Sequence, residues 1–327
     1  MELMETFKAL WTPSADRLPF WTTLPLSELP EGEVLVQVVY SGLNYKDALA
    51  LTGKGKILRR YPIVPGIDLA GRVLESQVPS FRPGDQVLAT GWGLGETHWG
   101  GYAELVRLPA SWLIPLPEGL SLEQAMALGT AGLTAMLGLM ALEDHGVLPP
   151  KDVVVTGATG GVGSLGIALL ACRGYRVIAV TRQVEEAAYL KGLGAAEVVP
   201  HEELITERPL ESERFPAALD AVGGKLLAGV LARMSRGGCV AACGNAGGAE
   251  LPTTVYPFIL RGVCLLGIDS AFAPRSLRLT AWNRLAQSFP LERLSEITRV
   301  VSWEELPDLA QMLVQGRHRG RWVLRVA

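Results

Sequence analysis

The stretch Val153–Ala171, VVVTGATGGVGSLGIALLA, decides the fold. Its first three residues, Val153–Val155, predict a short strand buried on both faces, because no polar residue alternates with them. Glycines follow at 157, 160, 161 and 163, and an apolar run of good helix formers comes next. A strand, a glycine turn and a helix in this order predict a dinucleotide site, in which backbone without Cβ atoms approaches a pyrophosphate at a helix N-terminus. A glycine turn of purely steric origin is the plainer alternative.

The turn has alanine in the first place of G-x-G-x-x-G, as Ala158-x-Gly160-x-x-Gly163. The predicted cofactor contacts in this turn are Thr159, Gly160, Gly161 and Val162. Strands and helices alternate around it from Gly129 onward, which predicts a doubly wound parallel sheet with strand order 3-2-1-4-5-6. The six predicted strands are Val153–Val155, Arg176–Val180, Glu197–Val199, Ala218–Ala221, Cys239–Cys243 and Cys264–Ile268.

The rest of the chain has a different sequence pattern. Residues 32–42 alternate like a half-buried antiparallel strand, and more short strands separated by Gly and Pro follow. These features predict a small irregular β-barrel over about the first 120 residues. The final strand, Arg321–Val326, is expected to return to it. We therefore predict a discontinuous domain, 1–127 and 270–327, around a nucleotide-binding domain, 128–269.

The composition and charge of the chain limit the classes of function and partner that fit it. Lys+Arg 30 against Asp+Glu 33 gives a net charge of −3, which does not indicate a nucleic-acid binder. The uncharged segment 124–142 contains three glycines and has no basic flank, so a buried helix is favoured over a membrane span. The acidic N-terminus is unlike a signal peptide, and the four cysteines are interpreted as buried reduced thiols. We expect a cytoplasmic protein with a small-molecule substrate and no nucleic-acid or membrane partner.

The second strand indicates the cofactor. In this architecture a carboxylate after the strand would bind the ribose 2′-hydroxyl of NAD. Here the strand is followed by Thr181, Arg182 and Gln183, with no carboxylate until Glu185. A hydroxyl beside a guanidinium suits a 2′-phosphate, which favours NADPH over NAD. The alternative is that Arg182 is an ordinary surface residue. Further contacts are expected after the fifth and sixth strands, at Asn245, Ile268 and Ser270.

A barrel interrupted by a nucleotide-binding domain with this glycine turn resembles the medium-chain dehydrogenase/reductase superfamily, whose barrel is GroES-like. Zinc-dependent members carry Gly-His-Glu and a cysteine in the barrel. This chain has Gly66-Ile67-Asp68 and no cysteine before Cys172, so no metal site is predicted. Longer stretches resemble the zinc-free acrylyl-CoA reductase (NADPH) and quinone oxidoreductase family. They are Ser41–Ile57, Thr90–Glu104, Leu128–Val147, Gly237–Gly248 and Leu251–Val263.

The resemblance implies reduction of the carbon–carbon double bond of acrylyl-CoA to propanoyl-CoA with NADPH, by a homodimer. It places Tyr45 beside the nicotinamide and Arg321 near the cofactor, and it puts His201 where relatives have arginine. The hydroxyl of Tyr45 is a candidate donor or proton source, and the alternative is that Tyr45 only packs on the cofactor. Asn44 and Asp47 complete the predicted catalytic set, to orient a carbonyl or carboxamide and to fix the loop. A quinone or general enone reductase, and a non-catalytic NADPH-binding redox sensor, remain the alternatives. Residues 54–60 contain four cations that either bind CoA phosphates or form a solvated face.

Overall fold

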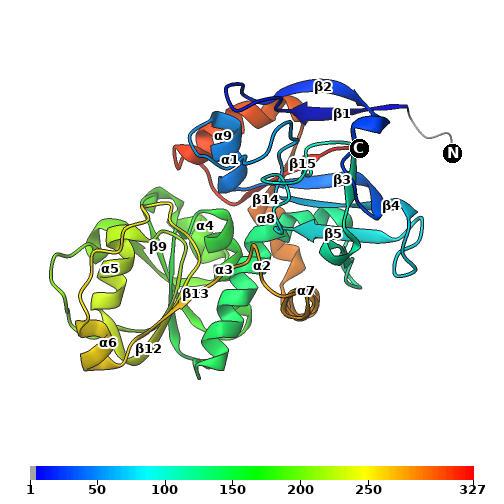
Figure 1. Ribbon diagram of the computed structural model, residues 1–327. Helices are drawn as coiled ribbons and strands as arrows, with labels where there is room; N and C mark the ends of the chain where they lie inside the picture. The colour runs from blue at the N-terminus through cyan, green and yellow to red at the C-terminus, as the bar shows by residue number, and fades with distance from the viewer. Residues whose placement is uncertain (1–4) are drawn as a thin grey trace. The chain divides into compact units, whose positions relative to one another are not determined.

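The computed structural model describes residues 5–327 and divides into two units (Figure 1). Unit 1 comprises 1–130, 271–286 and 298–327, and unit 2 comprises 131–270 and 287–297. Residues 1–4, part of the acidic start used in the localisation prediction, lie outside the described residues. The chain thus passes from unit 1 to unit 2 directly after Thr130.

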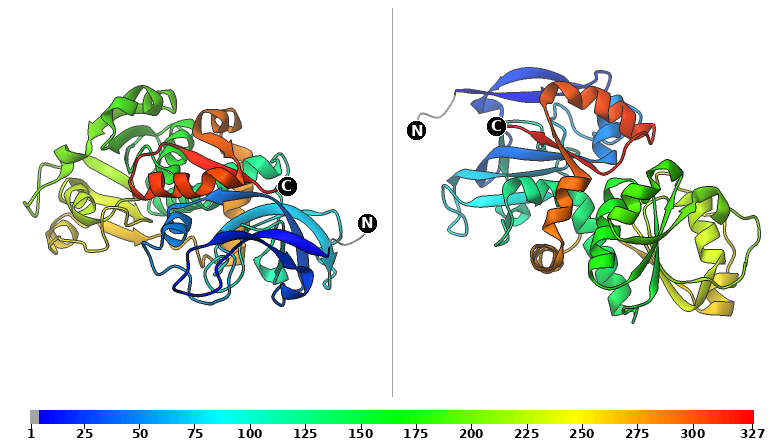
Figure 2. Two further views of the ribbon diagram at one scale, coloured as in Figure 1. Left: turned by 90° about the horizontal axis from the view of Figure 1, so that it is seen from above. Right: turned by 180° about the vertical axis from the view of Figure 1, so that it is seen from behind.

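Unit 2 contains a six-stranded parallel sheet in the order β10-β9-β8-β11-β12-β13, which confirms the predicted order. Its central strand is fully buried at Val153–Val155, as expected for a strand covered on both faces. Helices lie on both faces of the sheet (Figure 2). The strands are β8 (Asp152–Thr156), β9 (Arg176–Thr181), β10 (Ala195–Pro200), β11 (Phe215–Asp220), β12 (Met234–Ala242) and β13 (Cys264–Gly267). The helices within 151–270 are α3 (Gly161–Cys172), α4 (Ala187–Gly192), α5 (Gly224–Ala232), α6 (Tyr256–Arg261) and the short η3 (Val184–Glu186) and η4 (His201–Leu204).

Unit 1 contains a seven-stranded mixed sheet in the order β14-β15-β3-β4-β5-β7, with β6 also paired to β3. The long strand β3 is central because β4 and β6 both pair with its first part, while β15 pairs with its last residues, Tyr40–Leu43. The predicted return of the C-terminal strand is confirmed, since Trp322 lies opposite Leu43. The strands are β3 (Val34–Leu43), β4 (Asp68–Ser76), β5 (Gln86–Thr90), β6 (Leu105–Leu108), β7 (Ile114–Pro115), β14 (Thr298–Val301) and β15 (Arg321–Arg325).

Three parts of the chain differ from the fold predicted from the sequence. The sequence pattern missed β1 (Thr6–Trp11) and β2 (Phe20–Pro25), which form a separate antiparallel pair, and it missed β14. Residues 287–297, predicted with the first domain, group with unit 2, because α8 (Leu294–Ile297) buries Leu294 and Ile297 and contacts α3.

The other helices are α1 (Tyr45–Thr52), α7 (Arg275–Ser288), α9 (Leu306–Val314), η1 (Leu26–Glu28), η2 (Ala110–Trp112), η5 (Leu291–Arg293) and η6 (Trp303–Glu305).

Helix α2 (Leu122–Asp144) contains the uncharged segment that the sequence analysis weighed as a membrane span. It is the one helix among residues 5–327 that is long and apolar enough to cross a membrane, and 83% of its apolar window is buried inside the protein. Its course is interrupted at Gly129, where φ is 50° and ψ is −152°. A positive φ of this kind is accessible to glycine and strained for other residues.

Candidate active site

Helix α1 begins at Tyr45, directly after the buried strand β3. Asn44 is its N-cap and Asp47 lies three positions further on, so the two residues form a capping box. The backbone N–H of Asn44 donates to Oδ2 of Asp47 at 2.9 Å. This local pattern fixes the first turn of the helix, and with it the position of the Tyr45 backbone.

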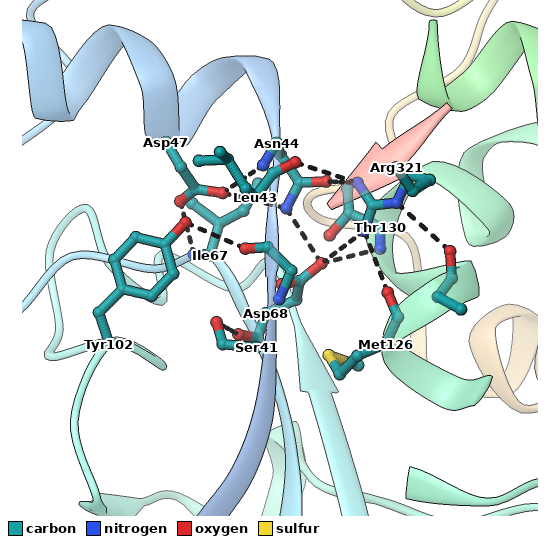
Figure 3. Close-up of polar contacts among 12 residues, drawn as sticks. Ser41, Leu43, Asn44, Asp47, Ile67, Asp68, Tyr102, Met126, Thr130 and Arg321 are labelled. Atoms are coloured by element: carbon teal, nitrogen blue, oxygen red, sulfur yellow. Dashed lines mark hydrogen bonds and ion pairs between the residues drawn. The ribbon is translucent and has the colours of Figure 1, made fainter. Parts of the chain in front are cut away.

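The side-chain amide of Asn44 is held inside the protein rather than left free (Figure 3). Its Nδ2 donates to Oδ2 of Asp47 and to Oδ2 of Asp68, each at 3.0 Å, and its Oδ1 accepts a hydrogen bond from Nη1 of Arg321 at 2.6 Å. Both N–H groups and the oxygen of the amide are therefore engaged. The predicted role of Asn44 in orienting a substrate carbonyl or a carboxamide is not supported by a free donor.

Arg321 also lies in this cluster, and its side chain is only 3% exposed. Besides Asn44, its guanidinium donates to the carbonyl oxygens of Leu43, Met126 and Ala127 at 3.2–3.4 Å. Its Nη2 lies 3.8 Å from Oδ2 of Asp68. The structure thus gives Arg321 interior partners, and its predicted direct contact with a cofactor has no free N–H directed outward to support it.

The cluster contains two buried carboxylates, Asp47 and Asp68, and one guanidinium. Burial, and next the negative charge of Asp68, raise the pKa of Asp47 to about 7. Tyr102 is also buried against this pair. Its hydroxyl donates to the carbonyl of Gly42 at 3.0 Å, and burial followed by the charge of Asp47 raises its pKa well above the usual value. Asp47 links the start of α1 to the segment before β4, because it accepts from the N–H of Asn44 and from the N–H of Ile67, each at 2.9 Å.

Tyr45 has a different environment from its neighbours. It is 37% exposed, and its hydroxyl makes no hydrogen bond among residues 5–327. The side chain that follows, Lys46, forms an ion pair with Glu96 at 2.8 Å. The structure therefore leaves the hydroxyl of Tyr45, the residue after Asn44, without a partner in the described chain.

In unit 2 the glycine turn has the geometry expected for anion binding. Gly160 is the N-cap of α3, and the first amide groups of that helix have no intrahelical acceptor. Gly157 adopts a positive φ of 60°. A Cβ atom at Gly163 would lie 2.2 Å from the carbonyl oxygen of Gly157, so the helix packs closely on the turn only with glycine there. Thr159, Gly160, Gly161 and Val162 surround this helix start, and this part of the chain fits a pyrophosphate.

The end of β9 carries the residues predicted to choose the cofactor. Thr181 is 3% exposed, and its Oγ1 accepts the N–H of Gln183 at 2.9 Å, which turns the chain sharply. Arg182 is exposed and forms no hydrogen bond or ion pair among residues 5–327. A free guanidinium at this end of the strand fits a 2′-phosphate.

The remaining predicted contacts follow other strands of the same sheet. His201 starts η4 after β10, and its Nδ1 lies 3.7 Å from Oε1 of Glu202. Asn245 is exposed after β12, whereas Ile268 is half-buried after β13 and donates its N–H to the carbonyl of Ala242. Ser270 accepts from the hydroxyl of Thr134 at 2.7 Å. Because the strands are parallel, their carboxyl ends lie at one edge of the sheet, where ligands of this architecture bind.

Sequence reasoning missed three residues that hold these sites in place. Asp68 was considered only because it stands where zinc-dependent relatives have a different residue, and no role was predicted for Tyr102. Asp220, fully buried, accepts from the hydroxyl of Thr156 at 2.6 Å and so links the ends of β11 and β8. Burial raises the pKa of Asp220. The sequence signal that could have identified the two aspartates is a charged residue within an apolar strand, because such residues are buried only when they are paired or hydrogen-bonded.

No cluster of three or more His, Cys, Asp and Glu side chains suited to a metal ion occurs in the described part of the chain. The four cysteines there are free thiols. Burial raises the pKa of Cys239 to about 11 and that of Cys243 to about 12, which keeps both in the protonated form at neutral pH. Cys172 and Cys264 are exposed, so the prediction of four buried thiols is wrong for these two.

Comparison with known proteins places these features in a family. Residues 30–118 match the alcohol dehydrogenase GroES-like domain, and residues 161–286 match the zinc-binding dehydrogenase family. The chain is 52% identical to the acrylyl-CoA reductase AcuI of Ruegeria pomeroyi, over 93% of each protein. The chain belongs to the medium-chain dehydrogenase/reductase superfamily. Within this superfamily it belongs to the acrylyl-CoA reductase and quinone oxidoreductase family named above.

Two solved structures of this superfamily carry a bound nicotinamide cofactor. The Escherichia coli YhdH structure with bound NADPH is 50% identical, with a TM-score of 0.95 over 98% of this chain and 100% of that one. The Bacillus subtilis yhfP structure has NAD bound and is 44% identical, with a TM-score of 0.93 over 98% and 99% of the two chains. Members of this family therefore bind either form of the cofactor.

Proposed function

We propose that this protein reduces the carbon–carbon double bond of acrylyl-CoA to give propanoyl-CoA, with NADPH as the reductant. The observation that carries the proposal is the 52% identity to an acrylyl-CoA reductase over 93% of both chains. The free guanidinium of Arg182 at the end of β9 supports the choice of NADPH over NAD, because no carboxylate follows β9 before Glu185 to bind a ribose 2′-hydroxyl.

The residues of unit 2 would hold the cofactor through its phosphates. Amide groups at the start of α3 bind the pyrophosphate, while Thr181, Arg182 and Gln183 bind the 2′-phosphate. His201, at the start of η4, adds a further contact. When bound, NADPH supplies the hydride that adds to the β-carbon of the unsaturated thioester.

The chain's own residues then act on the substrate without a metal. Hydride addition leaves an enolate whose charge lies on the thioester oxygen, and a hydrogen-bond donor stabilises that charge. We assign this donor to Tyr45, whose hydroxyl has no partner in the described chain and which also delivers a proton toward the α-carbon. Asn44 and Asp47 serve by holding the start of α1.

The coenzyme A part of the substrate has a candidate contact surface in the same unit. Lys54, Lys56, Arg59 and Arg60 are exposed, and their side chains form no ion pair among residues 5–327. The N–H of Arg59 donates to the carbonyl of Glu96, the residue that also pairs with Lys46 next to Tyr45. Unpaired cations beside the catalytic helix suit the phosphates of coenzyme A.

Initial rates of NADPH oxidation with acrylyl-CoA, crotonyl-CoA and a quinone test the proposal. We expect kcat/KM to be highest for acrylyl-CoA. The competing function is a quinone reductase with the same cofactor site, which the 46% identity to a Bacillus subtilis quinone oxidoreductase favours. A kcat/KM for the quinone that exceeds the acrylyl-CoA value by orders of magnitude would reject our assignment.

We also infer a homodimer located in the cytoplasm. Strand β13 lies at an edge of the six-stranded sheet, and neighbouring apolar side chains are exposed, namely Val255, Tyr256, Ile259 and Leu260. An edge strand beside exposed apolar side chains is suited to pairing with a second copy. Sedimentation should give twice the chain mass of 35.1 kDa, and a mass near 35.1 kDa would contradict the dimer. Cell fractionation would test the compartment.

A further inference from the structure

The Asp68–Arg321 pair is built around the interruption of helix α2. In a continuous helix the N–H of Thr130 would donate to the carbonyl of Met126, four residues earlier. Here the N–H of Thr130 donates to Oδ2 of Asp68 at 3.1 Å, while the carbonyl of Met126 accepts from Nη2 of Arg321 at 3.2 Å. The two charged side chains therefore replace the backbone hydrogen bond that the interruption removes.

The room for this pair comes from two glycines on different elements. A Cβ atom at Gly129 would lie 2.6 Å from Nη2 of Arg321 and 2.8 Å from Oδ2 of Asp68. A Cβ atom at Gly42, on β3, would lie 2.6 Å from the same Nη2 and 2.8 Å from Oδ1 of Asp68. The N–H of Gly42 also donates to Oδ1 of Asp68 at 2.7 Å. Strand β3, strand β15 and the interrupted helix thus meet at one buried pair.

The same pair holds the residue that precedes Tyr45. Asp68 accepts from Nδ2 of Asn44 and Arg321 donates to Oδ1 of Asn44, so the amide is fixed from both ends (Figure 3). Asn44 in turn caps the helix that starts at Tyr45. A shift of either charged side chain would therefore be transmitted to the backbone of Tyr45 through one intervening residue.

We propose that Asp68 and Arg321 are positioning residues of the reductase, which place the hydroxyl of Tyr45 by holding the side-chain amide of Asn44. The inference rests on the proposed function for the reaction that Tyr45 assists. The placement itself does not depend on which double bond or quinone is reduced. A pair that served stability alone would leave turnover unchanged in every variant that still folds.

A double-mutant cycle separates a role in positioning Tyr45 from a role in stability alone. Arg321→Lys keeps the charge opposite Asp68 but cannot reach Asn44, Met126 and Ala127 together, and Asp68→Asn removes the acceptor charge. We expect either change to lower kcat roughly 10- to 100-fold, as small misplacements of catalytic groups do, with little change in the Kd for NADPH. In the Tyr45→Phe background the same change should cost less than about threefold, because the group it positions is gone.

Arg325→Gln is the matched control. Arg325 lies on the same strand as Arg321, but its side chain is 61% exposed and pairs at the surface with Glu123. We expect its kcat to stay within about twofold of the unchanged enzyme. Equal losses of kcat with and without the Tyr45 hydroxyl, or no loss in a folded Arg321→Lys protein, would overturn the positioning role.

An NMR measurement tests whether Arg321 positions Tyr45 without relying on turnover. In protein labelled with ¹³C at tyrosine Cζ, we expect the Tyr45 signal to shift in Arg321→Lys and to remain in place in Arg325→Gln. An unshifted Tyr45 signal in Arg321→Lys would overturn the inference. A wild-type protein that reduces a quinone and not acrylyl-CoA would reject the proposed substrate, and the cycle would then be measured with the quinone.

Discussion

The two parts of the predicted site use their polar groups in opposite ways. In unit 1, Asn44, Asp68 and Arg321 are buried and bonded to one another. In unit 2, the guanidinium of Arg182 is exposed and unpaired in the described chain, and the backbone amides at the start of α3 have no intrahelical acceptor. Groups that are already paired hold a structure in place, whereas groups left unpaired are available to a ligand.

This difference changes how the predicted residues are interpreted. Both arginines were predicted as cofactor contacts, Arg182 from its place after the second strand and Arg321 from the resemblance to the family, yet only Arg182 has a free guanidinium. Within unit 1 the same contrast separates Tyr45, whose hydroxyl is free, from Asn44, whose amide is engaged. From this contrast we propose a binding role for Arg182, a chemical role for Tyr45, and a supporting role for Asn44, Asp68 and Arg321.

Removing one charge of the buried pair should have the largest effect on stability. Asp68→Asn leaves the guanidinium of Arg321 without its opposite charge, and breaking a buried pair in this way typically costs about 3 kcal/mol. We expect urea unfolding to show a decrease of this size. Arg325→Gln, which disrupts an exposed ion pair with Glu123, should change the unfolding free energy by less than about 1 kcal/mol. Similar losses in both variants would show that burial does not distinguish the two pairs.

Arg182→Ala should affect binding and leave stability unchanged, the reverse of the effect of Asp68→Asn. Hydrogen bonds to a charged group contribute about 1.5–3 kcal/mol, so the Kd for NADPH should rise roughly 10- to 100-fold. The Kd for NADH should remain nearly constant, because NADH lacks the 2′-phosphate. Titration by fluorescence measures both, with Arg208→Ala, an exposed arginine on the same unit, as the control. Equal weakening of both cofactors would remove Arg182 from the 2′-phosphate site.

Tyr45→Phe tests the free hydroxyl of unit 1. Loss of a proton donor should lower kcat at least about tenfold, while the Kd for NADPH stays within about threefold. Stability should not fall, because the hydroxyl has no partner in the described chain. Steady-state kinetics with acrylyl-CoA and a thermal melt measure both quantities. An unchanged turnover number would exclude Tyr45 as the donor.

The smallest expected effect is the pH dependence that Asp47 gives to the free energy of unfolding. Its pKa is raised from 3.8 to about 7 in the folded protein, so between these values the folded state keeps a proton that the unfolded state has lost. The contribution of Asp47 to stability therefore falls as the pH rises toward about 7 and is constant above it. Asp68, Tyr102 and Arg321 are the charged or titratable groups that face it.

Asp47→Asn cannot titrate, so it provides the reference for this effect. We expect the wild-type unfolding free energy, measured relative to Asp47→Asn in urea, to decrease between about pH 5 and about pH 8. A difference that stays constant over this range would contradict a raised pKa for Asp47.

Sequence was sufficient for the sheet of unit 2 because its signals are local. Val153–Val155 and the glycines that follow define a strand, a turn and a helix within a few residues, and parallel connectivity then limits the strand order. The strands β1 and β2 were missed because buried and exposed residues do not alternate regularly along them. Residues 287–297 were misplaced because their burial against α3 depends on tertiary packing.

The partners of Arg321 were beyond sequence reasoning for a related reason. Arg321 and Asn44 are separated by 277 positions, and no local pattern connects them. Asn44, Tyr45 and Asp47 could be grouped from the sequence because they follow a strand directly, where the structure has the start of α1. Which of them is free and which is engaged depends on Asp68 and Arg321, which arrive from other strands.

Isotope tracing tests the central claim of C=C reduction most directly. Acrylyl-CoA should be reduced with NADPH carrying deuterium in place of the transferred hydride, and separately with unlabelled NADPH in D₂O. Mass spectrometry of the propanoyl-CoA should find the cofactor's deuterium on the β-carbon and solvent deuterium on the α-carbon. Oxidation of NADPH without carbon-bound label in propanoyl-CoA would contradict the account.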